Sequence, residues 1–143
     1  MTTKQLKEIA RSDLQKIGVD IEQIRSIFFS ENPGMNKAGS YYYADSRGFY
    51  CTGVGDRGRI IPEKKFRSLE DTLFDIYWYI TFLVSTDYAV RNKIPGQDWR
   101  RPMFSKRLEL LKTLGDPYYL RGMKEIEVIL ANSPYRDTQP LKQ

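Results

Sequence analysis

Histidine is absent from this chain, and cysteine occurs once, as Cys51, among its 143 residues. The chain therefore lacks the commonest general acid–base group and metal ligand, and no Ser-His or Cys-His nucleophilic pair can form within it. A single cysteine excludes an internal disulfide and a cysteine-rich zinc site. We therefore expect no enzymatic activity, no catalytic residue, no cofactor and no metal site. An enzyme that relies on acids and tyrosines alone is the least favoured alternative.

Long hydrophobic runs are also missing. The most apolar stretch, residues 73–84, contains Asp75 and is too short to cross a bilayer. The N-terminal residues hold no apolar stretch before a cleavage site, so no secretory signal is visible. A lone thiol is compatible with a reducing cytosol. These features predict a cytoplasmic protein that makes no contact with a membrane.

Aromatic residues are abundant: ten Tyr, seven Phe and two Trp make up 13% of the chain. Burial of such rings offsets the entropy lost when a chain orders, so most of this chain should fold. A length of 143 residues suits one domain. We expect a single domain over residues 1–143, with a polar and mobile tail at 138–143.

The net charge is +5 and the pI is about 9.3, and the excess is uneven. Residues 91–124 hold nine basic and three acidic side chains, a surplus of +6, and residues 34–65 hold six and three, a surplus of +3. Residues 66–90 are acidic, with one basic and four acidic side chains. A basic chain can meet nucleic acid, an anionic membrane or an acidic protein.

Along the first half of the chain, hydrophobic periodicity and turn residues predict helices, followed by strands. A helix over residues 3–17 has its apolar residues on one stripe, and Asp20 can cap a second helix that runs to about Phe29. Residues 30–39 are turn formers and predict a loop. Three β segments follow, with links too short for a parallel crossover, so they predict an antiparallel meander. They are residues 41–43, 49–54 and 59–61.

A long helix is expected from Ser68 to about Asn92. Because it is apolar on most sides, it should be buried at the centre of the fold. Two further helices are expected over residues 98–114 and 116–131, separated by Gly115 and started by Pro at a first-turn position. The fold class is therefore α+β and mostly α, with a small three-stranded antiparallel sheet packed against a bundle of about four to five helices.

The segment Gly53-Val-Gly-Asp-Arg-Gly58 matches G-x-G-x-x-G. A dinucleotide site needs a helix directly after this motif. Here Arg-Ile-Ile-Pro follows, which resembles a strand, so a hairpin turn is the favoured interpretation.

Other side chains could bind a partner, and each has a structural alternative. The acids around Asp71 are a contact patch or the solvated strip of a buried helix. The arginines at 100 and 101 stand in a first helical turn, where the dipole disfavours cations, so an internal ion pair or a solvated face is favoured over nucleic-acid contact. The tyrosines and arginines of the sheet are core residues or a binding hot spot. The candidate partner-binding residues are Tyr41, Tyr43, Arg47, Arg57, Arg59, Glu70, Asp71, Asp75, Arg100, Arg101 and Tyr135.

Spaced motifs over residues 40–137 make the chain resemble the immunity protein 63 family of bacterial polymorphic-toxin and contact-dependent growth inhibition systems. Residues 1–39 have no counterpart in the resemblance and are expected to form an N-terminal helical extension. The motifs lie in the first hairpin, after the long helix, in the last helix and beyond it. They are Tyr41, Tyr43, Arg47 and Gly48; Asp98, Arg100, Arg101 and Phe104; Glu125, Ile126, Ile129 and Leu130; and Pro134, Tyr135 and Asp137.

The resemblance implies a cytosolic, non-catalytic protein that binds the C-terminal domain of one cognate toxin, in a 1:1 complex, and blocks its active site or a neighbouring surface. Either the toxin face is acidic, or the acids around Asp71 make the contact. The alternative function is a basic regulator that binds nucleic acid through the +6 block.

Overall fold

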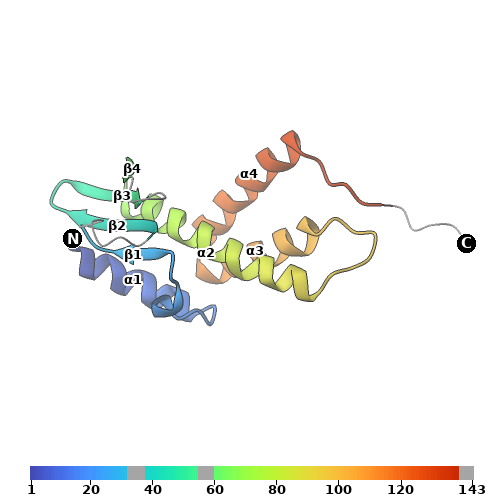
Figure 1. Cartoon of the computed structure of the whole chain (residues 1–143), viewed down its shortest axis with the longest axis horizontal. Helices are drawn as coiled ribbons and strands as arrows, with labels where there is room; N and C mark the ends of the chain where they lie inside the picture. Colours follow the sequence, from blue (N-terminus) through green and yellow to red (C-terminus); the bar gives the residue numbers. More distant parts are fainter. Residues whose placement is uncertain (32–37, 55–59, 139–143) are drawn as a thin grey trace, which may run out of the picture. The chain divides into compact units, whose positions relative to one another are not determined.

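The computed structural model describes residues 1–31, 38–54 and 60–138, and for residues 54 and 60–63 it describes the backbone only. The chain forms two compact units, Met1–Ile76 and Tyr77–Gln143. The boundary falls inside one long helix (Figure 1). The elements in chain order are α1 (Thr3–Gln15), the 3-10 helix η1 (Ile21–Gln23), β1 (Ile27–Phe29), β2 (Gly39–Asp45), β3 (Gly48–Val54), β4 (Ile60–Phe66), α2 (Leu69–Arg91), α3 (Arg100–Leu114) and α4 (Asp116–Asn132).

The first unit contains a four-stranded mixed sheet with the order β1-β2-β3-β4. Strand β1 runs parallel to β2, and the other two pairs are antiparallel. The prediction of a three-stranded antiparallel sheet is therefore wrong in strand number and in one pairing, while the α+β class is confirmed. The described residues form four α-helices, within the predicted number.

The predicted helix from Asp20 to Phe29 is also wrong. The Asp20 carboxylate accepts the N–H of Glu22 at 3.0 Å, as a cap should, but the helix is a single 3-10 turn and Ile24 is already extended. Phe28 then stacks on the Tyr41 ring of β2, with 4.7 Å between centroids. Pairing with β2 and this ring contact therefore accompany an extended backbone at residues 27–29 in place of a second helical turn.

Gly39 explains how β1 and β2 approach each other. Its φ is +150°, and a Cβ at this position would lie 2.5 Å from the backbone oxygen of Ser26. The next residue, Ser40, donates its N–H to that same oxygen at 2.9 Å. Only glycine allows the backbone to come this close.

Helix α1 packs on β1 and β2, alongside the sheet in Figure 1. It begins with a capping box between Thr2 and Gln5. Three residues of its predicted stripe, Leu6, Ala10 and Leu14, are fully buried, whereas Ile9 and Ile17 are half-buried and Ile17 lies beyond the end of the helix. The described N-terminal residues are therefore part of the first unit.

The hairpin turns agree with the sequence where they are described. The Asp45 carboxylate accepts the N–H groups of Arg47 at 2.7 Å and Gly48 at 3.1 Å, which closes the turn between β2 and β3. The G-x-G-x-x-G segment ends β3, and the antiparallel strand β4 follows where a dinucleotide site needs a helix. Residues 55–59 of that segment lie outside the described residues.

The second unit consists of the α2 residues from Tyr77 onward, α3, α4 and the segment after α4. Its core contains Ala89, Met103, Phe104 and Ile126. Helix α2 was predicted to be buried on most sides, and this is wrong for Phe82 and Leu83, which are both 37% exposed. No helix among the described residues is long and apolar enough to cross a membrane.

Candidate partner-binding surface

The tyrosines of β2 divide between core and surface. Tyr41 is buried, with 2% of its surface exposed. Tyr43, on the same face of the sheet, is half-buried and stacks on its cross-strand partner Tyr50 with 5.0 Å between ring centroids. Of the two predicted contact tyrosines on β2, Tyr43 is therefore partly accessible and Tyr41 is not.

Two exposed cations belong to the same part of the sheet as this tyrosine pair. Arg47 is exposed at the hairpin turn, and Lys65 of β4 is exposed and stands opposite Tyr50 in the strand register. We call Tyr43, Arg47, Tyr50 and Lys65 the hairpin surface. Aromatic rings beside exposed cations are typical of binding hot spots. The predicted residues Arg57 and Arg59 lie outside the described residues.

The three predicted acids do not form one patch of similar side chains. Glu70 is exposed and Asp71 is half-buried, and the Asp71 N–H is capped by the Ser68 hydroxyl at 3.1 Å. Asp75 accepts a hydrogen bond from the Tyr42 hydroxyl at 2.5 Å and lies 3.7 Å from the Lys64 ammonium. Asp75 is therefore engaged within the first unit.

Burial and the neighbouring Asp75 charge raise the pKa of Tyr42, so its hydroxyl stays protonated and remains a donor. Burial also raises the pKa of the Cys51 thiol. A thiol held in its protonated form is a poor nucleophile. The Tyr42–Asp75 hydrogen bond therefore ties β2 to α2, and the neighbouring Cys51 thiol is held in its less nucleophilic form.

In the second unit, the N–H donors of the Arg100 side chain all have acceptors within the protein. Its Nε and Nη2 groups donate to the Asp98 carboxylate at 2.9–3.3 Å. Its Nη1 and Nη2 groups also donate to the backbone oxygens of Ser133 and Pro134, each at 2.8 Å, and Nη1 to the Ser133 hydroxyl at 3.4 Å. A guanidinium has five N–H donors, and all five have acceptors here.

Arg101 makes a second, more exposed pair. Its Nε and Nη2 groups donate to the Asp137 carboxylate at 2.7–3.1 Å, and its guanidinium lies 4.0 Å from the centre of the Tyr135 ring. Tyr135 is half-buried, whereas Arg101 and Asp137 are exposed. Arg101 can pair with a carboxylate and stack on a ring at the same time because its guanidinium group is planar, unlike the ammonium group of lysine.

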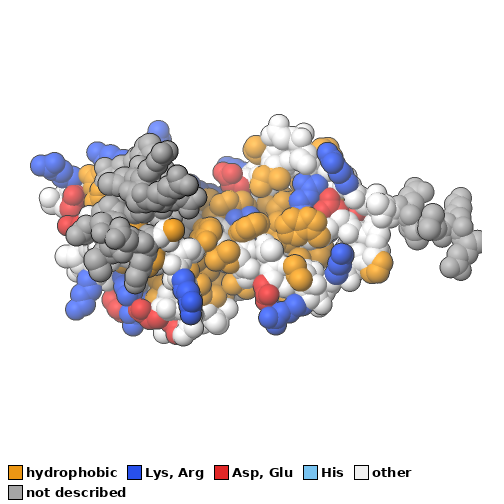
Figure 2. Space-filling view, in the orientation of Figure 1, with side chains coloured by type: hydrophobic (Ala, Val, Ile, Leu, Met, Phe, Trp, Pro, Cys, Tyr) orange, Lys and Arg blue, Asp and Glu red, His pale blue; other side chains and the backbone are white. Residues whose placement is uncertain are grey.

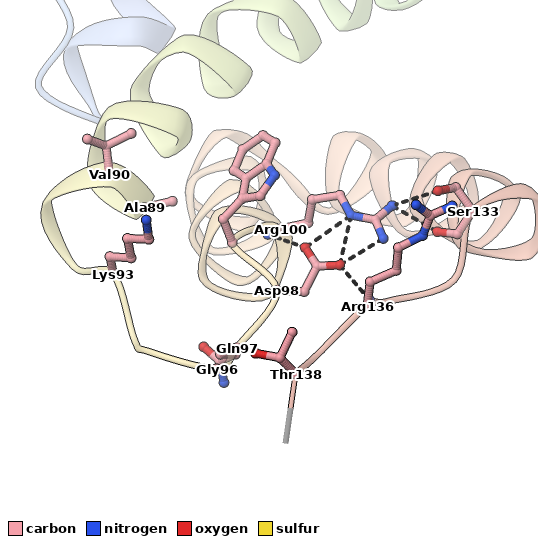
Figure 3. Close-up of a pocket in the computed structure, with 11 residues that line it drawn as sticks. Ala89, Val90, Lys93, Gly96, Gln97, Asp98, Arg100, Ser133, Arg136 and Thr138 are labelled. Atoms are coloured by element: carbon pink, nitrogen blue, oxygen red, sulfur yellow. Dashed lines mark hydrogen bonds and ion pairs between the residues drawn. The ribbon is translucent and has the colours of Figure 1, made fainter. Parts of the chain in front are cut away.

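Backbone groups join the two pairs. The Asp98 N–H donates to the Asp137 carboxylate at 2.7 Å, and the Arg136 N–H donates to the Asp98 carboxylate at 2.8 Å. The Thr138 N–H donates to the Gly96 oxygen at 2.9 Å. Residues 133–138, which we call the C-terminal strap, are thereby fastened across the start of α3 (Figure 3).

Two interpretations of these arginines were favoured, an internal ion pair and a solvated face, and the structure shows an internal ion pair for each of them. Hydrogen bonds from Arg100 hold the pKa of Asp98 well below its usual range, and those from Arg101 lower the pKa of Asp137. The motifs Asp-x-Arg-Arg and Pro-Tyr-x-Asp are thus two halves of one network. Its first role is to position the strap, and Arg101 and Tyr135 remain accessible on its outer side.

Arg107, part of the same basic block, points into the second unit. Its guanidinium lies 3.2 Å from the centre of the Trp78 ring and donates to the Trp78 carbonyl, and its Nε donates to the Thr81 hydroxyl at 3.4 Å. Burial lowers the pKa of Arg107 to about 9, so it stays charged at neutral pH. The Arg107 side chain therefore interacts within the second unit and is not available to a partner at the surface.

Sequence reasoning missed an exposed apolar stripe on α2. Tyr79, Phe82, Leu83 and Val90 are 37–70% exposed and recur at helical spacing on one face. Trp99, directly before α3, is 46% exposed. Figure 2 shows hydrophobic side chains at the surface over these helices, with isolated charged side chains among them. The spacing was visible in the sequence, but the helix is apolar on so many sides that periodicity could not indicate which side stays exposed.

The family model described as Immunity protein 63 matches residues 46–128. The chain belongs to the immunity protein 63 family. The matched residues run from the turn of the hairpin surface through β3, β4, α2 and α3 and into α4, so the family signature includes parts of both units. Tyr43 and the strap lie outside the matched residues. No curated protein and no solved structure matches the chain.

The protein is therefore an immunity protein, of a family whose members are generally not enzymes. A protein toxin is the general kind of partner that this family implies. The resemblance predicted from spaced motifs is confirmed, over a somewhat shorter range than residues 40–137.

Proposed function

We propose that this immunity protein binds the C-terminal domain of one cognate bacterial toxin in a 1:1 complex in the cytoplasm. It neutralises the toxin by occupying its active site or a neighbouring surface and performs no reaction of its own. The family match carries this proposal. The system would be a polymorphic-toxin system of the contact-dependent growth inhibition type.

The hairpin surface and the outer side of the strap network are the contact regions that the geometry supports best. Tyr43, Arg47, Arg101 and Tyr135 are at least partly accessible, and aromatic and arginine side chains dominate interface energetics. Glu70 and Asp71 can add contacts at the edge of the interface with the toxin. Tyr41, Asp75 and Arg100 act indirectly, because each is buried or engaged by internal partners.

The nucleic-acid alternative loses support from the way the basic block is used. Five of its nine cations form ion pairs, and Arg107 is buried. Two of the five pairs use acids from outside the block, Asp87 and Asp137. The +6 surplus is therefore not a free cationic surface of the kind that neutralises phosphates.

Co-expression tests the proposed function. The toxin domain encoded by the neighbouring gene is induced in bacteria with or without this protein. We expect growth arrest with the toxin domain alone and rescue with the immunity protein, and a 1:1 mass for the purified complex by light scattering. Absence of rescue, with both proteins soluble, would overturn the proposal.

Variants of the hairpin surface locate the contact. The double variant Tyr43→Ala/Arg47→Glu should weaken toxin binding on the order of 10-fold or more, since it removes one ring and reverses one charge. The matched control Arg25→Glu changes an exposed cation elsewhere in the first unit and should bind as the wild type does.

A further inference from the structure

A pocket of about 720 Å³ opens beside the strap (Figure 3). The end of α2, the loop before α3 and the strap form its walls, all within the second unit. Three apolar residues line it: Ala89, Val90, which is 70% exposed, and Trp99, which is 46% exposed. An exposed tryptophan beside a pocket is a typical anchor point for a protein partner.

The Asp98–Arg100 ion pair lines this pocket and is fully hydrogen-bonded. Asp98 is the one acidic residue among the described residues that line it, and both carboxylate oxygens already accept hydrogen bonds from Arg100, with the Arg136 N–H as a further donor. Arg100 in turn has all its donors used. Neither group of this buried pair is available to a ligand, and the pair leaves no net charge.

The rim of the pocket is cationic. Lys93 stands on the α2 side and the Arg136 side chain rises from the strap, and both residues are exposed (Figure 3). Among the described residues, no carboxylate lies within ion-pair distance of either side chain. The pocket thus has an apolar wall and two unneutralised cations at separate edges.

We infer that this pocket receives an acidic segment of the toxin domain, in which an apolar side chain sits between acidic ones. The apolar group packs against Trp99 and Val90, and the carboxylates pair with Lys93 and Arg136. This inference rests on the proposed function and deepens it. It also chooses between the two possibilities left open by the basic composition: the toxin presents an acidic face to this protein.

The test compares two double charge reversals by titration calorimetry against the toxin domain encoded by the neighbouring gene. Lys93→Glu/Arg136→Glu alters the rim of the pocket. Lys4→Glu/Lys124→Glu alters two exposed cations away from the pocket and changes the net charge by the same amount. We expect the pocket variant to raise Kd on the order of 10- to 100-fold and the control to stay within about 2-fold.

A second measurement follows Trp99 itself. The chain has two tryptophans, so its NMR spectrum has two indole N–H signals, and Trp99→Phe identifies the one from the pocket. We expect this signal to shift when the toxin domain is added. The milder variant Lys93→Gln/Arg136→Gln should raise Kd several-fold, and it serves if the charge reversal fails to fold.

The outcomes separate the two proposals. Unchanged affinity in the pocket variants, equal losses in both charge reversals, or an unmoved Trp99 signal in a formed complex would overturn the pocket and leave the proposed function intact. A shift of that signal by a single-stranded RNA but not by the toxin domain would also overturn it. A wild-type protein that does not bind the toxin domain would instead overturn the proposed function.

Discussion

Asp98 is the residue on which the strap network converges. Its carboxylate accepts hydrogen bonds from the Arg100 side chain and from two backbone N–H groups, those of Arg100 and Arg136. Its own N–H is held by Asp137. One side chain therefore accepts the first backbone N–H of α3, neutralises a largely buried arginine and fixes the chain beyond α4. The cost of losing it should exceed that of any exposed ion pair.

The variant Asp98→Asn should lower the free energy of unfolding by about 2–3 kcal/mol, because it leaves the Arg100 guanidinium without its counter-charge in a mostly buried place. Urea denaturation at pH 7 measures this loss. The control Asp87→Asn breaks an exposed pair with Arg91 and should cost less than about 0.5 kcal/mol. Equal losses in the two variants would show that the strap network contributes no more than a surface pair.

The same network predicts how stability depends on pH. The pKa values of Asp98 and Asp137 are lowered in the folded protein, so their contribution is fully present above the unfolded pKa of about 3.9. It is lost as the pH falls below that value and through the lower folded pKa. The difference in unfolding free energy between the wild type and Asp98→Asn should therefore narrow from about pH 5 to pH 3. A constant difference over that range would contradict the assignment.

At the scale of the elements, local signals predicted the helices well and missed one strand. The end of α3 and the start of α4 follow from Gly115 and the Pro after Asp116, which act within a few residues. Strand β1 depends on a parallel pairing with β2 and on the close approach at Gly39, and neither has a local signature. A three-residue strand is also too short for its periodicity to show.

The partner-binding surface was only partly predictable for a related reason. Alternation placed Tyr41 and Tyr43 on one face correctly, but only the packing of Phe28 shows that Tyr41 is buried. Asp98 and Asp137 are 39 residues apart, and no pattern in the sequence indicates that the Asp98 N–H donates to the Asp137 carboxylate. The resemblance included both residues, yet it could not show that they meet.

Helix α4 approaches α3 at Gly122. A Cβ there would lie 2.6 Å from Cδ1 of Leu111, which is fully buried, and 3.4 Å from the Trp78 ring. Alanine gains up to about 1 kcal/mol in helix propensity over glycine, but forcing a methyl group into a packed core costs about 1–3 kcal/mol. We expect Gly122→Ala to lower the free energy of unfolding by about 1 kcal/mol.

Thermal unfolding of Gly122→Ala checks this prediction, with Ser105→Ala on the exposed side of α3 as the propensity control. Shortening the neighbour should relieve the clash, so Leu111→Val and Gly122→Ala together should cost less than the sum of the two single variants. A stabilised Gly122→Ala protein would mean that Leu111 moves aside freely and that the two helices are not tightly packed there.

At the scale of the whole molecule, the important property is net charge, because ion pairs within the protein leave part of it uncompensated. The chain carries a net +5 although many of its cations are paired internally. Among the described cations for which no ion pair is found are Lys65 and Arg47 on the hairpin surface and Lys93 and Arg136 at the pocket, and these two sets belong to different units. Both units therefore present positive charge to a partner.

A positive protein that meets an acidic toxin face should associate quickly and in a salt-dependent way. Opposite fields steer the two molecules together, and salt screens that attraction beyond about 10 Å at 0.1 M. We expect the association rate constant to fall at least several-fold between about 50 mM and 500 mM NaCl, with a smaller change in the dissociation rate. Stopped-flow mixing with the toxin domain measures both, and Lys93→Glu/Arg136→Glu should flatten the salt dependence more than Lys4→Glu/Lys124→Glu does. If the association rate constant of the wild type does not change with the NaCl concentration, the toxin face is neutral and the unpaired cations do not guide binding.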